Sequence, residues 1–212
     1  RESARLRCII HGPQGICGGV LRLTGGEARG CRLKAPRGLL IRPTADRVRE
    51  ALFDILGARV RGARFLDVYA GTGAVGCEAL SRGAVRVVFL ERHRGALSLI
   101  RDNLRLGPWS VSSEIIEGDA CGSLRELARL GARFDILFLD PPYDDPVLPD
   151  ALALASRLLD RDGLLVLEHR FCAAVAAPGG SALLPVRAYR YGDTSLTIWR
   201  AGSAAGRPAI RA

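Results

Sequence analysis

An Asp-Pro-Pro-Tyr tetrapeptide, Asp140 to Tyr143, directly follows an apolar run at 134–139 that is predicted to be a buried strand. Open α/β sheets bind their ligands at the carboxyl ends of such strands. The two prolines fix the backbone, so the carbonyl of Pro141 has a set direction and no competing N–H. This carbonyl and the Asp140 carboxylate can accept two hydrogen bonds from an amino group and hold it in line with a sulfonium methyl group. Tyr143 offers a flat face for a base that has left its stack. We expect a catalytic loop composed of Asp140, Pro141, Pro142 and Tyr143.

A second motif, at 65–76, joins an apolar strand to a helix through a glycine-rich turn. Gly71, Gly73 and Gly76 form a G-x-G-x-x-G pattern, in which the backbone can approach a ligand closely and the helix N-terminus presents free N–H groups. The pattern alone fits a dinucleotide equally well. Asp67, four residues before the first glycine, favours a different ligand, because a carboxylate can hold a cationic amino group but is of no use to a pyrophosphate.

Two further carboxylates follow the next strands. Glu91 ends the strand at 86–91 and suits a ribose diol. Asp119 could accept a hydrogen bond from an adenine amino group, although it could equally be a helix N-cap. The residues that we expect to bind the methyl-donating cofactor are Asp67, Gly71, Thr72, Gly73, Glu91 and Asp119. Direct methyl transfer needs no metal and no covalent nucleophile, so we predict neither.

The elements that position these residues alternate along the chain. Strand-like runs alternate with helical stretches, which is typical of βαβ units and a parallel sheet covered on both faces. After residue 168, two β-like runs separated by Gly192-Asp193 predict an antiparallel hairpin at the sheet edge. The predicted fold is α/β, a Rossmann-like sheet of seven strands in a domain at 64–201, followed by a flexible tail at 202–212. The expected strands are 64–69, 86–91, 113–117, 134–139, 164–168, 182–191 and 194–200, and the expected helices are 74–82, 94–106, 122–130 and 146–159.

The N-terminal third differs in charge. Residues 1–64 contain 14 Lys and Arg against 5 Asp and Glu, whereas the rest of the chain has 17 of each. A basic module joined to a neutral one indicates a polyanionic partner. We therefore treat 1–63 as a basic extension that binds RNA, with a hairpin around Gly25-Gly26 and a helix at 44–60 whose N-cap is Thr44.

Composition excludes several classes of protein. The chain is 48% hydrophobic and 25% charged, as in ordinary globular proteins. Its longest apolar runs fall far short of the ~20 residues of a membrane span, and no segment has the length of a signal peptide's apolar core. The 6 cysteines form no C-x-x-C pair and the 3 histidines are not spaced as metal ligands. We expect a cytoplasmic protein with reduced thiols, no metal and no membrane partner.

In its glycine-rich turn, its Asp-Pro-Pro-Tyr loop and several further blocks, the sequence resembles the RsmD-type guanine-N2 methyltransferases of bacterial small-subunit (16S) ribosomal RNA. The resemblance covers about residues 20–200. Its most specific part is the block R-P-T-A-D-R-V-R-E at 42–50, which generic methyltransferases lack. It continues through L-D-V-Y-A-G-T-G at 66–73, E-A-L-S-R-G-A at 78–84, D-P-P-Y at 140–143 and Y-G-D-T at 191–194.

The resemblance implies that the carboxylates and glycines named above line an S-adenosylmethionine pocket, and that the Asp-Pro-Pro-Tyr loop holds the N2 amine of a guanine. It also implies that the substrate is 16S rRNA within an assembled or nearly assembled 30S particle. The residues expected to contact this RNA are basic residues of the N-terminal third: Arg22, Arg29, Arg32, Arg42, Arg47 and Arg49.

Three alternatives remain open. An N6-adenine or N4-cytosine methyltransferase of DNA or another RNA uses a similar loop, but this chain has no recognisable target-recognition domain. A nicotinamide-dependent oxidoreductase conflicts with Asp67 and with the Asp-Pro-Pro-Tyr loop. A ribosome-assembly protein with a vestigial cofactor site conflicts with the intact set of cofactor and catalytic residues.

Overall fold

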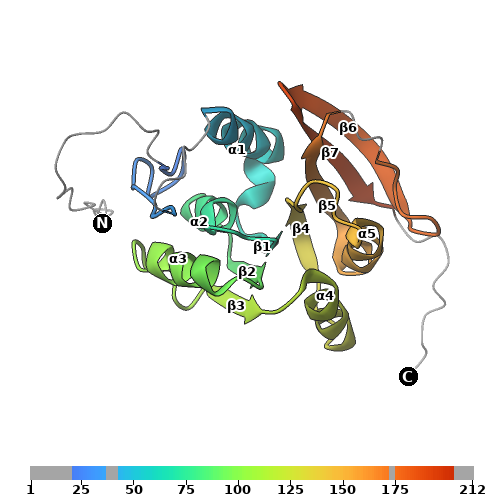
Figure 1. Ribbon diagram of the computed structural model, residues 1–212, viewed down its shortest axis with the longest axis horizontal. Helices are drawn as coiled ribbons and strands as arrows, with labels where there is room; N and C mark the ends of the chain where they lie inside the picture. Colours follow the sequence, from blue (N-terminus) through green and yellow to red (C-terminus); the bar gives the residue numbers. More distant parts are fainter. Residues whose placement is uncertain (1–20, 37–42, 172–174, 203–212) are drawn as a thin grey trace.

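The computed structural model describes residues 21–36, 43–171 and 175–202. A single sheet of seven strands runs through it in the order β3-β2-β1-β4-β5-β7-β6 (Figure 1). The first five strands are parallel, and β7 lies antiparallel between β5 and β6. The predicted Rossmann-like α/β class, with its antiparallel C-terminal pair, is confirmed. The strands are β1 Arg64–Val68, β2 Arg86–Glu91, β3 Ser113–Glu117, β4 Phe134–Leu139, β5 Leu159–Arg170, β6 Leu183–Tyr191 and β7 Thr194–Ala201.

Helices cover both faces of this sheet. In Figure 1, α1, α2 and α3 lie on one side and α4 and α5 on the other. Successive side chains of a strand point to opposite faces, so Phe65 and Phe138 belong to the core under the first set, and Leu66 and Leu139 to the core under the second. Burial on both faces explains why these strands are nearly continuous apolar runs. The helices are α1 Pro43–Leu56, η1 Gly57–Val60 (3-10), α2 Ala74–Ser81, α3 Arg94–Leu104, α4 Ala120–Arg129 and α5 Leu148–Ser156.

The predicted N-terminal hairpin is present in a minimal form. Arg22 and Arg32 form one antiparallel bridge. Leu23 N donates to Cys31 O at 3.0 Å. The segment packs on α2, where Glu27 N donates to the carbonyl of Ser81 at 2.7 Å, and its apolar side chains join the same core as β1. The hairpin is thus attached directly to the helix that follows the glycine turn.

Several element boundaries differ from the prediction, and two of these differences have a clear physical reason. The first helix begins at Pro43 and not after Thr44, because proline fits the first helical turn, where no N–H is needed. Helix α5 is shorter than expected and β5 begins at Leu159, five residues earlier than expected. Leu159 pairs with Phe134 of β4, and such a pairing between distant residues leaves no trace in local periodicity.

No helix in the described part of the chain is long and apolar enough to cross a membrane. Within the same residues, no three His, Cys, Asp or Glu side chains gather into a group that could hold a metal ion. Cys77 and Cys121 are buried free thiols, whereas Cys31 is disulfide-bonded. The expectation of reduced thiols is therefore wrong at Cys31, because spacing along a sequence does not reveal which sulfur atoms meet in the fold.

Candidate active site

A cavity of ≈ 440 Å³ opens at the carboxyl ends of the parallel strands. The chain runs outward from β1 to β3 and then returns to β4 beside β1, and open α/β sheets bind ligands at such a switch point. The volume lies in the range of small-molecule sites. Its walls come from the carboxyl ends of the five parallel strands and from the segments that follow them: Tyr69, Leu90, Glu91, Arg92, His93, Gly118, Asp119, Ala120, Asp140, Pro141, Pro142, Tyr143, Asp145, Val147 and Glu168.

The predicted catalytic loop lies in this wall with all four of its residues, Asp140 to Tyr143. Strand β4 ends at Leu139 and delivers the loop to the cavity. The chain then turns back through Asp144, whose φ is 63°, and Asp145 N donates to Pro142 O at 3.2 Å. Pro141 is buried, whereas the Tyr143 side chain remains 52% exposed. The loop therefore presents an accessible aromatic ring beside a fixed carboxylate.

Four carboxylates crowd this end of the sheet, those of Asp67, Glu91, Asp140 and Glu168. Burial raises the pKa of Asp67 well above its usual value, and repulsion from Asp140 and Glu91 adds to the shift. Burial also raises the pKa of Glu168, and the neighbouring Asp140 carboxylate raises it further. Surrounding protein atoms raise the pKa of Asp140 too, although this side chain still meets solvent on the open side of the cavity. Such mutual repulsion makes the cavity favourable for a cation.

Asp67 lies beneath the glycine turn. Its side chain is 1% exposed, it does not line the cavity, and its Oδ2 accepts a hydrogen bond from Gly76 N at 2.9 Å. Gly76 itself has no room for a side chain, because an added Cβ would lie 2.1 Å from Cε1 of Phe89. The structure thus gives Asp67 a role in holding the turn, and its contact with a cofactor stays a prediction. Gly71, Thr72 and Gly73 are not among the lining residues either, and their contact with a cofactor likewise stays a prediction.

Glu91 lines the cavity at the end of β2 and is held by backbone donors. Its Oε1 accepts from the N–H groups of Arg92 and His93, both at 2.8 Å, and its Oε2 accepts from Gly71 N at 2.8 Å. Asp119 lines the cavity as well, and its Oδ1 caps α4 by accepting from Gly122 N at 2.8 Å. The N-cap alternative for Asp119 is therefore correct, and its other carboxylate oxygen remains available to a ligand.

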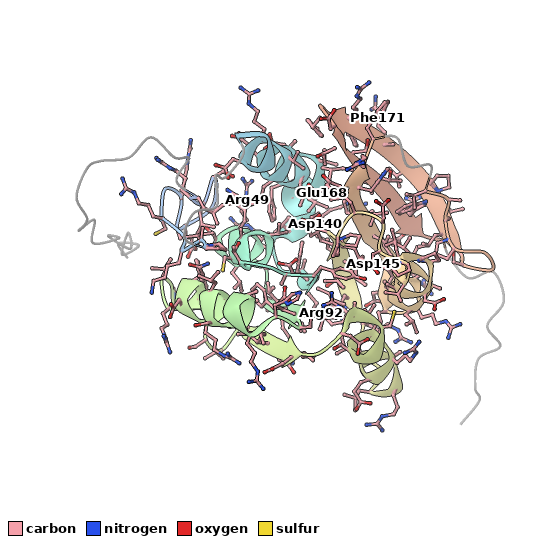
Figure 2. The ribbon with its side chains drawn as sticks, in the orientation of Figure 1. Arg49, Arg92, Asp140, Asp145, Glu168 and Phe171 are labelled. Atoms are coloured by element: carbon pink, nitrogen blue, oxygen red, sulfur yellow. The ribbon has the colours of Figure 1, made fainter. Side chains whose placement is uncertain are left out.

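Sequence reasoning missed several residues of this site. Tyr69 lines the cavity with a left-handed φ of 64°, and its hydroxyl donates to Asp145 Oδ2 at 2.9 Å. No sequence signal pointed to Tyr69 or Asp145. Glu168 could have been found, because it lies at a strand carboxyl end as Glu91 does. Arg92, Asp140, Asp145 and Glu168 gather around the end of the sheet (Figure 2).

The basic residues expected to contact RNA divide into three groups. Arg22, Arg29, Arg32 and Arg47 are exposed, and their guanidinium groups form no ion pair with any residue that the structure describes. Arg42 lies outside the described residues. Arg49 forms the third group, because its side chain is buried.

Arg49 is buried, with 6% of its surface exposed. Its Nη2 donates to Arg22 O at 2.7 Å and lies 3.1 Å from Asp46 Oδ1, and its Nε lies 3.7 Å from Glu78 Oε2. The prediction that Arg49 contacts RNA is therefore corrected: its guanidinium attaches the hairpin and α1 to α2. The sequence block that contains it could not distinguish a phosphate contact from an internal ion pair.

Two arginines stack on aromatic rings, one of which, Tyr143, lines the cavity. The guanidinium of Arg170 lies 4.8 Å from the ring centroid of Tyr143, and that of Arg190 lies 3.6 Å from the centroid of Phe171. All four side chains are exposed, and Phe171 is labelled in Figure 2 at the end of β5. Stacking of this kind is typical of surfaces that receive bases. The ring of Tyr143 is thus already a stacking platform.

Comparison with known proteins now identifies the family. Residues 21–200 match the family model described as Conserved hypothetical protein 95. The chain belongs to this family. Among its relatives, YlbH of Bacillus subtilis (strain 168) is 34% identical over 182 residues, which cover 85% of this chain and 98% of YlbH.

A second relative, the Ribosomal RNA small subunit methyltransferase D of Escherichia coli (strain K12), is 35% identical over 150 residues, or 71% of this chain and 72% of that protein. The solved structure of the Escherichia coli protein yhhF superimposes with a TM-score of 0.76 at 30% identity, covering 87% of this chain and 99% of that one. Membership of the RsmD-type family, predicted from the sequence blocks, is confirmed.

Proposed function

We propose that this protein transfers the methyl group of S-adenosylmethionine to the exocyclic N2 amine of a guanine in small-subunit ribosomal RNA. The observation that carries the proposal is the Asp-Pro-Pro-Tyr loop in the wall of an acidic cavity at the switch point of the sheet. The rRNA substrate is supported by family membership, since a relative that aligns over 71% of this chain is a ribosomal RNA small subunit methyltransferase.

The charges of the cavity fit this cofactor. S-adenosylmethionine bears a sulfonium and an ammonium group, and both are favoured by the negative potential that the carboxylates lining the cavity create. When bound, it supplies a methyl group on a positively charged sulfur that leaves readily. Glu91 is held in place to accept from a ribose diol, and Asp119 to accept from an adenine amino group. A dinucleotide would bring a negatively charged pyrophosphate against the same carboxylates, which disfavours the oxidoreductase alternative.

The residues of the loop then orient the target amine. The Asp140 carboxylate and the carbonyl of Pro141 accept the two N–H bonds, which turns the nitrogen lone pair toward the methyl group. Orientation of this kind can supply most of the acceleration in a displacement reaction. As the new N–C bond forms, the nitrogen loses a proton, and the Asp140 carboxylate is placed to receive it. Tyr143 stacks on the extruded base in exchange for the guanidinium of Arg170.

The RNA itself is proposed to meet the exposed arginines of the N-terminal hairpin and α1, together with Arg170 beside the cavity. These guanidinium groups have no carboxylate partner in the described part of the chain, so they are available to phosphates. An assembled or nearly assembled 30S particle is the proposed substrate, because the resemblance implies a particle and not naked RNA.

Mass spectrometry of nucleosides tests the proposal directly. Small subunits from a strain that lacks this gene are incubated with the protein and isotopically labelled S-adenosylmethionine, and N2-methylguanosine should gain the label. Parental small subunits, already methylated, are the matched control and should gain none. Label in N6-methyladenosine, in N4-methylcytidine or in DNA would replace the proposal with the second methyltransferase alternative. Cofactor binding without any methyl transfer would favour an RNA-binding protein with a vestigial site.

A further inference from the structure

Asp140 and Glu168 stand side by side at the ends of neighbouring parallel strands. Leu139 of β4 pairs with Leu167 of β5, and the two carboxylates follow directly in the same register. Neighbours in register point to the same face of a sheet. Both residues line the cavity, and both are labelled in Figure 2.

Neither carboxylate has a partner within the described part of the chain. No hydrogen bond and no ion pair reaches either of them from the residues that the structure describes, although Glu91 and Asp119 in the same cavity each accept from backbone N–H groups. Two unpaired carboxylates at the ends of neighbouring strands repel each other, and removal from water raises the pKa of each. The pair is therefore set up to receive donors from a ligand.

The position of Glu168 separates it from the expected cofactor contacts. Strands β1 and β4 lie between β5 and β2, and adjacent strands are spaced by ~4.8 Å, so Glu168 and Glu91 are roughly 14 Å apart along the edge of the sheet. Arg170 follows two residues later on the same face of β5, and its guanidinium stacks on Tyr143. A base lying on Tyr143 with its amine at Asp140 would thus direct its hydrogen-bonding edge toward Glu168.

The edges of the bases differ in what they can offer to two adjacent acceptors. An ionised carboxylate only accepts hydrogen bonds. Guanine presents two neighbouring donors, N1–H and the N2 amino group. Adenine and cytosine present their amino group beside an unprotonated ring nitrogen, whose lone pair would face the second carboxylate. Two adjacent carboxylates therefore match guanine and reject the other two amino-bearing bases.

We propose that Glu168 accepts the N1–H of the target guanine while Asp140 accepts from its N2 amine, which makes Glu168 the residue that selects guanine. This inference rests on the proposed function and adds to it the residue that determines which base is methylated. The sulfonium cation in the same cavity favours the ionised form of both carboxylates.

The test compares guanine with 2-aminopurine at the modified nucleotide of reconstituted small subunits, in single-turnover methylation. 2-Aminopurine keeps the target amine but has an unprotonated N1 and lacks O6. The parent should methylate guanine about 10- to 100-fold faster than 2-aminopurine, the range for loss of one specific base contact. Glu168→Gln should slow guanine methylation and reduce this preference at least about tenfold, because a glutamine amide can donate to N1. Loss of O6 affects both proteins alike and cancels in the comparison.

Two further variants complete the design. Glu168→Asp keeps the negative charge and should retain the preference for guanine at a lower rate. Glu126→Gln makes the same chemical change on the exposed face of α4 and should behave as the parent. Thermal melting and the affinity for S-adenosylmethionine are measured for each variant.

Each outcome has a distinct meaning. If the parent methylates neither base, the proposed function fails and not the inference about Glu168. If the parent methylates guanine and Glu168→Gln keeps the parental preference, or slows both bases by the same factor, Glu168 serves the cofactor or the fold, and the inference is overturned.

Discussion

The hydroxyl of Tyr69 donates a hydrogen bond to Asp145 Oδ2 at 2.9 Å, across 76 positions of sequence. Tyr69 belongs to the turn that precedes α2, and Asp145 closes the catalytic loop through its own N–H to Pro142. Burial and this bond raise the pKa of Tyr69, so the hydroxyl remains a donor at physiological pH. The contact ties the loop that is proposed to hold the base to the turn that is proposed to border the cofactor.

Replacing Tyr69 with phenylalanine should therefore loosen the catalytic loop while the ring stays in place. We expect Tyr69→Phe to lower the single-turnover methylation rate by about 10- to 100-fold, since small misplacements of reacting groups have effects of this size. Binding of S-adenosylmethionine, measured by calorimetry, should change much less. The matched control is Tyr191→Phe, whose hydroxyl forms no hydrogen bond within the described residues. Equal methylation rates for the two variants would mean that the hydrogen bond from Tyr69 to Asp145 does not position the catalytic loop.

The sequence predicted the parallel core of the fold well for a physical reason. The strands at 86–91, 113–117 and 134–139 have their predicted bounds. Each of them is flanked by polar or glycine-containing turns, which mark its ends in the sequence. The predicted position of the junction between α5 and β5 was wrong, because Leu158 and Leu159 continue a helical pattern of leucines. Only the pairing of Leu159 with Phe134 makes Leu159 a strand residue.

The site was predictable to the extent that it lies at strand ends. The Asp-Pro-Pro-Tyr loop, Glu91 and Asp119 were found because each follows an apolar run. The contact between Tyr69 and Asp145 was not predictable, since it depends on how two loops meet in space. Burial was the second limit: a sequence does not tell whether an arginine such as Arg49 lies inside or outside.

Arg49 and Arg47 allow a buried and an exposed arginine of the same helix to be compared. Arg49→Ala leaves Glu78, which is fully buried, without one of its cationic neighbours, and removing one partner of a buried ion pair typically costs about 3–5 kcal/mol. We expect the lower part of this range, because Arg82 also pairs with Glu78. Denaturant unfolding measures the change.

Arg47→Gln removes an exposed guanidinium from the same helix. It should leave the free energy of unfolding nearly unchanged, weaken binding to small subunits and reduce the salt slope of that binding by about 1, as expected for one lost phosphate contact. A salt slope that stays the same would assign Arg47 to a solvated surface with no role in RNA binding. An Arg49→Ala protein of parental stability would restore Arg49 to the candidate RNA contacts.

Asp67 predicts a specific dependence of stability on pH. Its pKa in the folded protein is raised by burial, so the folded state retains a proton that the unfolded chain has already released above its pKa of about 3.9. The stability that this group contributes is therefore fully present below the unfolded pKa and is lost as the pH rises through the folded pKa. Asp67→Asn can still accept from Gly76 N and has no charge to bury.

We expect the free energy of unfolding of Asp67→Asn, relative to the parent, to increase between pH 5 and pH 8 in denaturant titrations. Asp193→Asn, in the exposed turn between β6 and β7, is the control for loss of a charge. Affinity for S-adenosylmethionine should fall in Asp67→Asn if the carboxylate also attracts the cofactor's amino group. A difference from the parent that does not vary with pH would mean that Asp67 is ionised at little cost in the folded protein.

The catalytic loop itself allows the ring and the carboxylate to be separated. Asp140→Ala removes one acceptor for the amine and leaves the Pro-Pro backbone in place, so the misoriented amine should react about 100-fold more slowly. Tyr143→Phe keeps the stacking face and should be mild, because the hydroxyl forms no hydrogen bond within the described residues. Tyr143→Ala should be severe, since stacking of one base on an aromatic ring is worth about 1–3 kcal/mol.

The order of these effects is the decisive result. Single-turnover methylation of undermethylated small subunits should give a mild loss for Tyr143→Phe and large losses for Tyr143→Ala and Asp140→Ala. The affinity for S-adenosylmethionine should remain close to that of the parent in both Tyr143 variants. If Asp140→Ala kept a near-parental rate, the carbonyl of Pro141 alone would suffice to orient the amine. If Tyr143→Phe were as damaging as Tyr143→Ala, the hydroxyl and not the ring would be the group that meets the substrate, because the phenyl ring retains the whole stacking surface that lies beneath the base.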